Sequence, residues 1–140
     1  MSRIKIQLPE SFSFITFIPI RITDLNYGNH VGNDSILSLM HEARVQFLAN
    51  YGLAELEFEG VGLIMSDVGI EYKAELKYGD AIKVYVVAAN FSKVSFDIYY
   101  KLVNEATGEL VTIAKTGMVC FDYDKKKVVA LPEKAREKLS

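Results

Sequence analysis

Residues 21–44 read RITDLNYGNHVGNDSILSLMHEAR and combine a tight turn with the start of an apolar helix. The segment from Asn26 to Asn29 is rich in residues that tolerate positive φ angles, which predicts a turn. Four apolar residues then recur at spacings of four, three and four, the period of one helix face: Ile36, Met40, Ala43 and Phe47. We therefore predict that a strand ends near Arg21 and that, after the turn, a long helix runs to about Ala49.

The polar residues before the apolar run, His30 to Ser35, are typical of a helix N-terminus, because such side chains accept hydrogen bonds from its first N–H groups. A helix start leaves about four backbone N–H groups unpaired and carries a partial positive charge. An oxyanion or a polarised carbonyl is stabilised at such a place. No other stretch of the chain concentrates a histidine, carboxylates and a helix start in so few residues. We expect the functional site here.

The composition indicates a single globular domain over residues 1–140. Half of the residues are hydrophobic, which fits a packed core and excludes disorder. A net charge of −2 gives no electrostatic reason to expect nucleic-acid binding. The mean hydropathy of +0.13 is high for so small a domain and favours burial of surface between subunits.

Membrane insertion, secretion and metal binding are not expected from the sequence. No apolar run approaches the ~20 residues that a membrane span needs. The first ten residues, MSRIKIQLPE, do not have the pattern of a signal peptide. Cys120 is the only cysteine, and we expect it to be a buried strand residue in a cytoplasmic protein. With one cysteine and two distant histidines, no structural zinc site is expected.

The period of the hydrophobic residues changes from 3.6 to 2 after residue 62. Four half-buried antiparallel strands are predicted from this alternation, over residues 62–76, 81–91, 92–104 and 108–124, and Gly69 marks a place for a bend in the first of them. Residues 11–22 are also rich in β-formers, and Pro19 indicates an edge strand or a bulge. Pro132 is well placed to open a short C-terminal helix. The α+β order predicts one sheet of about five strands wrapped around the long helix, because nothing else can cover that helix.

This arrangement resembles the hot-dog fold, and the motif at the turn makes the resemblance more specific. Thioesterases related to 4-hydroxybenzoyl-CoA thioesterase carry a pattern like R-x-x-D-x-D-x-x-G-H-V-x-N, followed by a helix that ends in E-A-R. The matching positions in this chain are Arg21, Asp24, Asn26, Asn29, His30, Val31 and Asn33, then Glu42, Ala43 and Arg44. Ile70, Tyr72 and the Tyr-Gly-Asp turn at 78–80 resemble later parts of that family, so the resemblance covers about residues 11–124.

Two positions depart from the family pattern. Asn26 stands where the family has the aspartate that works as nucleophile or general base, and Asn29 replaces the usual glycine. An amide cannot take a proton at neutral pH, but it can orient a water or bind a thioester carbonyl. Asp34 is an additional carboxylate at the expected helix start.

The resemblance implies an acyl-CoA thioesterase, which releases a free acid and CoA. Such hydrolysis needs an activated water or a carboxylate nucleophile, with donors aimed at the developing oxyanion. The candidate catalytic residues are Asn26, His30, Asp34 and Asp24, and the candidate substrate-binding residues are Val31 and Asn33. Each acid has a structural alternative, since Asp34 also suits an N-cap and Asp24 a hydrogen bond within the turn. His30, too, can simply satisfy the turn backbone.

Other functions stay open at this level. A hot-dog protein that has lost its base at Asn26 would bind an acyl thioester without hydrolysing it. A hot-dog dehydratase would need a different local pattern of histidine and carboxylate. By resemblance we expect a homodimer or homotetramer with its site between subunits, no metal and no cofactor except the CoA of the substrate. The acyl group, and the choice between CoA and an acyl carrier protein, stay undetermined. Asp67 lies near the site if its side chain points inward.

Overall fold

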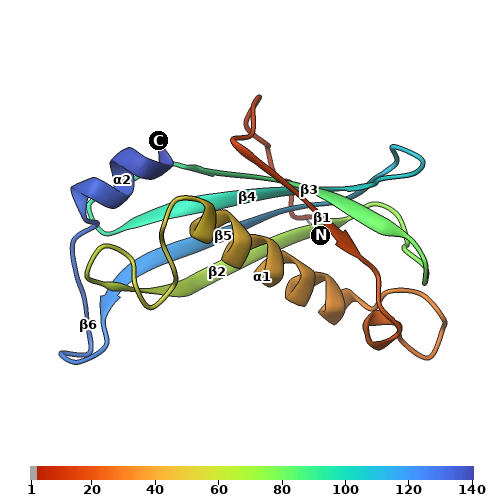
Figure 1. Cartoon of the computed structure of the whole chain (residues 1–140), viewed down its shortest axis with the longest axis horizontal. Helices are drawn as coiled ribbons and strands as arrows, with labels where there is room; N and C mark the ends of the chain where they lie inside the picture. Colours follow the sequence, from red (N-terminus) through yellow and green to blue (C-terminus); the bar gives the residue numbers. More distant parts are fainter. Residues whose placement is uncertain (1–2) are drawn as a thin grey trace.

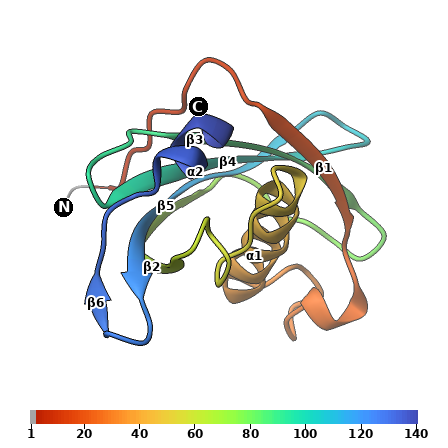
Figure 2. The same cartoon turned by 60° about the vertical axis from the view of Figure 1, so that its left-hand side comes forward.

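The computed structural model describes residues 3–140 and contains one antiparallel sheet, two α-helices and a short 3₁₀ helix. The elements in chain order are β1 (Phe14–Pro19), η1 (Ile22–Asp24), α1 (Asn33–Asn50), β2 (Gly62–Tyr72), β3 (Ala81–Ala89), β4 (Ser95–Asn104), β5 (Leu110–Asp122), β6 (Lys127–Val128) and α2 (Glu133–Leu139). Figures 1 and 2 show the sheet curving around α1, which lies on its concave side. The predicted α+β class and the wrapped central helix are confirmed. The two-residue strand β6 adds a sixth strand to the five expected.

The strand order β1-β3-β4-β5-β2 makes β1 and β2 the two edges of the sheet, while β6 pairs only with the end of β5. Strands β3, β4 and β5 follow one another as antiparallel hairpins, so the centre of the sheet is built from local connections. Pro19 closes β1 at an edge, as predicted, because proline cannot donate to a neighbouring strand. The helix start at Asn33 lies at the end of the sheet where β2 finishes, since the Tyr72 hydroxyl donates to the Asn33 carbonyl at 3.1 Å.

The core lies between α1 and the concave face of the sheet. All four residues of the predicted helix stripe, Ile36, Met40, Ala43 and Phe47, are at most 4% exposed. The inward residues of β3 and β4 alternate with half-exposed neighbours, as the period of two predicted. Buried residues from Ile36 to Leu48 anchor α1 against the sheet and so position its first turn.

The distortion in β2 lies at Ser66 and not at Gly69, where the sequence suggested a bend. The pairing with β5 shifts between Met65 and Asp67, whereas Gly69 pairs regularly with Lys115. Asp67 therefore faces away from α1, and its carboxylate lies 3.2 Å from the Lys115 ammonium. This outward position places Asp67 outside the functional site.

Two other expectations concern burial and membranes. Cys120 is fully buried in β5, as predicted, and burial raises the pKa of its thiol to about 11. Within residues 3–140, neither helix has the length and apolar character of a membrane span.

Candidate functional site

The turn before α1 is held by Asp24, which is 4% exposed. Its carboxylate accepts a hydrogen bond from the Arg21 backbone N–H at 2.8 Å and lies 3.2 Å from the Arg21 guanidinium. Its carbonyl accepts the Gly32 N–H at 3.3 Å. Asp24 therefore makes the contacts within the turn that the sequence offered as an alternative, and both of its acceptor groups are used there.

The Asn26–Asn29 turn has the predicted character, but only one of its residues is left-handed. Asn29 has a φ of 64°, whereas Gly28 has a negative φ. The Asn26 side-chain oxygen accepts the Gly28 N–H at 2.8 Å, and the Asn26 N–H donates to the His30 carbonyl at 2.9 Å. The Asn26 amide thus stabilises the turn that presents His30.

Helix α1 begins without a side-chain cap, which corrects the expectation that residues 30–35 would cap it. Its N-cap residue is Gly32, and no side-chain hydrogen bond is made there. Asp34 is the second residue of the helix, so the interpretation of Asp34 as an N-cap is wrong. Within residues 3–140, the first N–H groups of α1 thus have no capping side chain and are available to a ligand oxygen.

The Asp34 carboxylate lies directly over Gly32. A Cβ atom built on Gly32 would be 2.6 Å from Asp34 Oδ1 and 3.6 Å from Asn26 Cβ. The Tyr72 hydroxyl donates to the Asn33 carbonyl at 3.1 Å, so the phenol also lies at this helix start. Burial and the negative charge of Asp34 raise the pKa of that hydroxyl. Asp34, Asn26 and Tyr72 therefore surround the uncapped helix start.

A cavity of about 260 Å³ lies beside this helix start. It is lined by His30, Val31, Asn33, Ile36, Tyr72, Lys73, Ala74, Glu75 and Leu76. The structure thus brings three of the six candidates to this cavity, namely His30, Val31 and Asn33. Its other wall comes from β2 and the following loop, which lie about 40 residues away along the chain and were not predicted as site residues. The resemblance at Tyr72 was a sequence signal that pointed there.

His30 has one ring nitrogen towards the cavity rim and one inside the protein. Its Nε2 lies 3.9 Å from Glu75 Oε1. Its Nδ1 is buried and has no hydrogen-bond partner among the described residues. A buried polar atom without a partner is costly, so this nitrogen is a natural place for a water or a substrate group.

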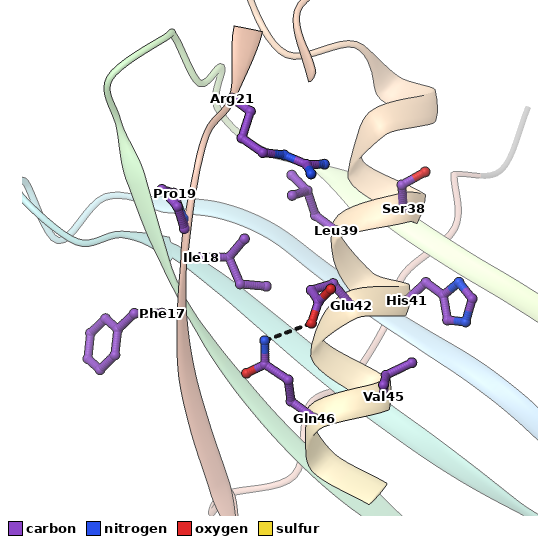
Figure 3. Close-up of a pocket in the computed structure, with 10 residues that line it drawn as sticks. All are labelled: Phe17, Ile18, Pro19, Arg21, Ser38, Leu39, His41, Glu42, Val45 and Gln46. Carbon is purple, nitrogen blue, oxygen red and sulfur yellow. Dashed lines mark hydrogen bonds between the residues drawn. The ribbon is translucent and has the colours of Figure 1, made fainter. Parts of the chain in front are cut away.

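A larger cavity, of about 410 Å³, separates β1 from the middle of α1 (Figure 3). Arg21 reaches from the end of β1 towards the helix, and Glu42 accepts a hydrogen bond from Gln46 at 2.8 Å (Figure 3). The cavity begins at Ser38, one helical turn after Asp34 on the same face of α1. Sequence reasoning assigned no function to this groove.

Two of three comparisons relate this chain to known proteins. A family model described as "Thioesterase-like superfamily" matches residues 20–139. Among curated proteins, no sequence matches the chain significantly.

Similar solved structures include a 1,4-dihydroxy-2-naphthoyl-CoA thioesterase from Synechocystis, with a TM-score of 0.82, 20% identity, and coverage of 90% of this chain and 94% of that one. A DHNA-CoA thioesterase from Staphylococcus aureus gives a TM-score of 0.79 and 23% identity, over 89% of this chain and 88% of that one. A gentisyl-coenzyme A thioesterase gives a TM-score of 0.80 and 17% identity, over 91% of this chain and 100% of that one.

At these identities the structural likeness confirms the predicted hot-dog fold. The family match covers the turn, α1 and all strands after it, and it supports the prediction of a thioester hydrolase. This chain belongs to the thioesterase-like superfamily.

Proposed function

We propose that the protein hydrolyses an acyl-CoA thioester to a free acid and CoA, with no cofactor beyond the CoA of its substrate. The observation that carries the proposal is the uncapped start of α1, which borders the His30 cavity at Asn33 and carries the Asp34 carboxylate in its first turn. Family membership supports the reaction class. The aromatic acyl-CoA substrates named for the similar structures show what this fold accommodates elsewhere.

The first turn of α1 supplies the electrostatic part of this reaction. A thioester carbonyl that enters beside Asn33 receives hydrogen bonds from the free N–H groups, and the helix dipole stabilises the negative charge that develops on its oxygen. A carboxylate takes a proton from water, whose oxygen attacks the carbonyl carbon. The C–S bond then breaks, and the proton passes to the departing CoA sulfur. Acyl-CoA and water thus give the acid and CoA.

The alternative function is binding of an acyl thioester without hydrolysis. The observations in its favour are the amide at Asn26 and the engagement of Asp24 by Arg21. A thiol-release assay over short, long and aromatic acyl-CoA substrates separates the two functions. We expect turnover well above the uncatalysed rate with at least one substrate. Binding of acyl-CoA without thiol release, by protein shown to be folded, would establish the alternative.

We also propose that the chain forms a homodimer through the free edge of β2. This strand is 11 residues long and contains no proline, whereas the other edge, β1, is six residues long and ends in Pro19. A long edge strand without proline favours pairing with another strand, and a second copy of β2 is an available partner. Two such dimers would make the homotetramer that the resemblance suggests.

Cross-linking tests this edge. Single cysteines introduced in turn at residues 65–69, in a Cys120→Ser background, are expected to give disulfide-linked dimers at one or two positions near the two-fold axis. Ile15→Cys, on the edge strand β1, is the matched control and is expected to stay unlinked. A monomeric mass by light scattering, or equal cross-linking at Ile15, would contradict pairing through β2.

A further inference from the structure

We propose that Asp34 is the general base of this site and that it replaces, from the helix, the carboxylate that is missing at residue 26. This inference rests on the proposed thioester hydrolysis. In the family pattern the acid comes from the turn, whereas here the turn carries Asn26 and the acid comes from the second residue of α1.

The two positions converge in space although eight residues separate them. The point where a Gly32 Cβ would lie is 2.6 Å from Asp34 Oδ1 and 3.6 Å from Asn26 Cβ. The Asp34 carboxylate and the Asn26 side chain therefore both border Gly32, and the Asn26 amide oxygen is turned towards the Gly28 N–H. Gly32 adjoins the free N–H groups of α1, where the thioester carbonyl would be held.

Asp34 is also the uncommitted acid of the site. Within residues 3–140 its carboxylate makes no hydrogen bond and no ion pair, whereas Asp24 is engaged by Arg21. Glu75 lies on the far rim of the cavity, where its side chain is 69% exposed and faces His30. A general base needs a free lone pair that solvent can reach, and the exposed Asp34 carboxylate has one.

Gly32 is the positioning residue in this arrangement. Its backbone is extended, with a φ of −71° and a ψ of 154°, so another residue could adopt this conformation. What glycine provides is space, because any Cβ would occupy the place of the Asp34 carboxylate. The glycine and the aspartate therefore work together.

In the proposed step, Asp34 removes one proton from a water as the water oxygen bonds to the thioester carbon. The carbonyl oxygen takes the negative charge and is held by the N–H groups of α1. When the C–S bond breaks, the protonated Asp34 returns the proton to the CoA sulfur, directly or through a water. The carboxylate is thereby regenerated without any further reactant.

A position-swap experiment tests the inference with the acyl-CoA substrate that wild type turns over best. Asp34→Ala is expected to lower kcat by about 10²–10⁴-fold. The double variant Asn26→Asp/Asp34→Ala is expected to have a kcat at least about tenfold higher than that of Asp34→Ala, because the turn now supplies the carboxylate. Asp124→Ala, which removes an exposed acid from the β5–β6 turn, is the control and is expected to keep wild-type activity.

A pH profile adds a readout that a structural role would not change. Asn26→Asp alone places two carboxylates side by side, so the acid limb of kcat/KM is expected to move to higher pH. Circular dichroism and light scattering confirm that each variant is folded and assembled.

The outcomes separate the inference from the proposed function. If wild type releases no thiol from any substrate, the hydrolase proposal fails and the inference fails with it. If wild type is active and Asp34→Ala is equally active, the function stands and Asp34 is not the base. If Asp34→Ala is inactive and the double variant Asn26→Asp/Asp34→Ala is equally inactive, Asp34 has a structural role. The proposal that it replaces a carboxylate at residue 26 is then refuted.

Discussion

Replacing Gly32 by alanine is expected to lower kcat/KM by about 10–100-fold with little change in stability. The added Cβ would lie 2.6 Å from Asp34 Oδ1, so the carboxylate must swing away from the helix start. Such a movement costs little in folding, because the end of an exposed side chain can rotate freely. In catalysis a displacement of about 1 Å is enough for a loss of this size. Thiol-release kinetics and urea unfolding, measured on the same samples, test both parts of this prediction.

Gly69→Ala is the matched control for that substitution. Its added Cβ would meet the Ile4 side chain at 3.6 Å, an ordinary van der Waals distance on the face of β2 that points away from α1. We expect wild-type activity and a change of less than about 1 kcal/mol in the free energy of unfolding. Full activity of Gly32→Ala would show that the carboxylate position is unimportant. A large loss of stability would show that Gly32 acts through folding.

Most of the fold was predictable because its elements have strong and different periods. The stripe from Ile36 to Phe47 and the alternation in β3 and β4 each bury one face, and the structure confirms both. The bulge at Ser66 was not predictable, because it arises from the pairing of β2 with β5 and has no local turn residue. Gly69 carried the expected signal for a bend, yet it pairs in regular register with Lys115.

For the candidate site, the sequence indicates a location but not its geometry. The motif predicts the turn and the helix start, but it does not reveal where a side chain points. The polar residues before α1 looked like caps, whereas the structure uses Gly32 and leaves the N–H groups free. The walls formed by Tyr72 and Glu75 come from the other end of β2 and from its loop. Such contacts depend on the assembled sheet, so local sequence patterns cannot supply them.

Arg44, the last residue of the E-A-R motif, places a buried charge in the core. Arg44 is 5% exposed; its Nε lies 2.8 Å from Glu55 Oε1, and a second guanidinium nitrogen donates to the Tyr100 hydroxyl at 3.3 Å. The same hydroxyl lies 2.7 Å from Thr116 Oγ1. Burial alone lowers the pKa of Arg44, but interactions with Tyr100 and Glu55 outweigh it and raise the pKa above its ordinary value. The charged Arg44 guanidinium is therefore buried between α1 and the sheet, and Glu55 is its counter-ion.

Replacing Glu55 by glutamine is expected to reduce the free energy of unfolding by about 2–3 kcal/mol, because it leaves that guanidinium without its partner. The figure is below the full cost of breaking a buried pair, since the Glu55 side chain is 27% exposed and water can partly compensate. Glu57→Gln, in the same loop but exposed, is the control and is expected to change stability by less than about 0.5 kcal/mol. In Arg44→Met/Glu55→Gln the buried charge is gone as well, so stability should recover above that of Glu55→Gln. Urea unfolding of wild type and the three variants measures these free energies of unfolding. Equal reductions in Glu55→Gln and in Arg44→Met/Glu55→Gln would mean that Arg44 contributes packing rather than charge.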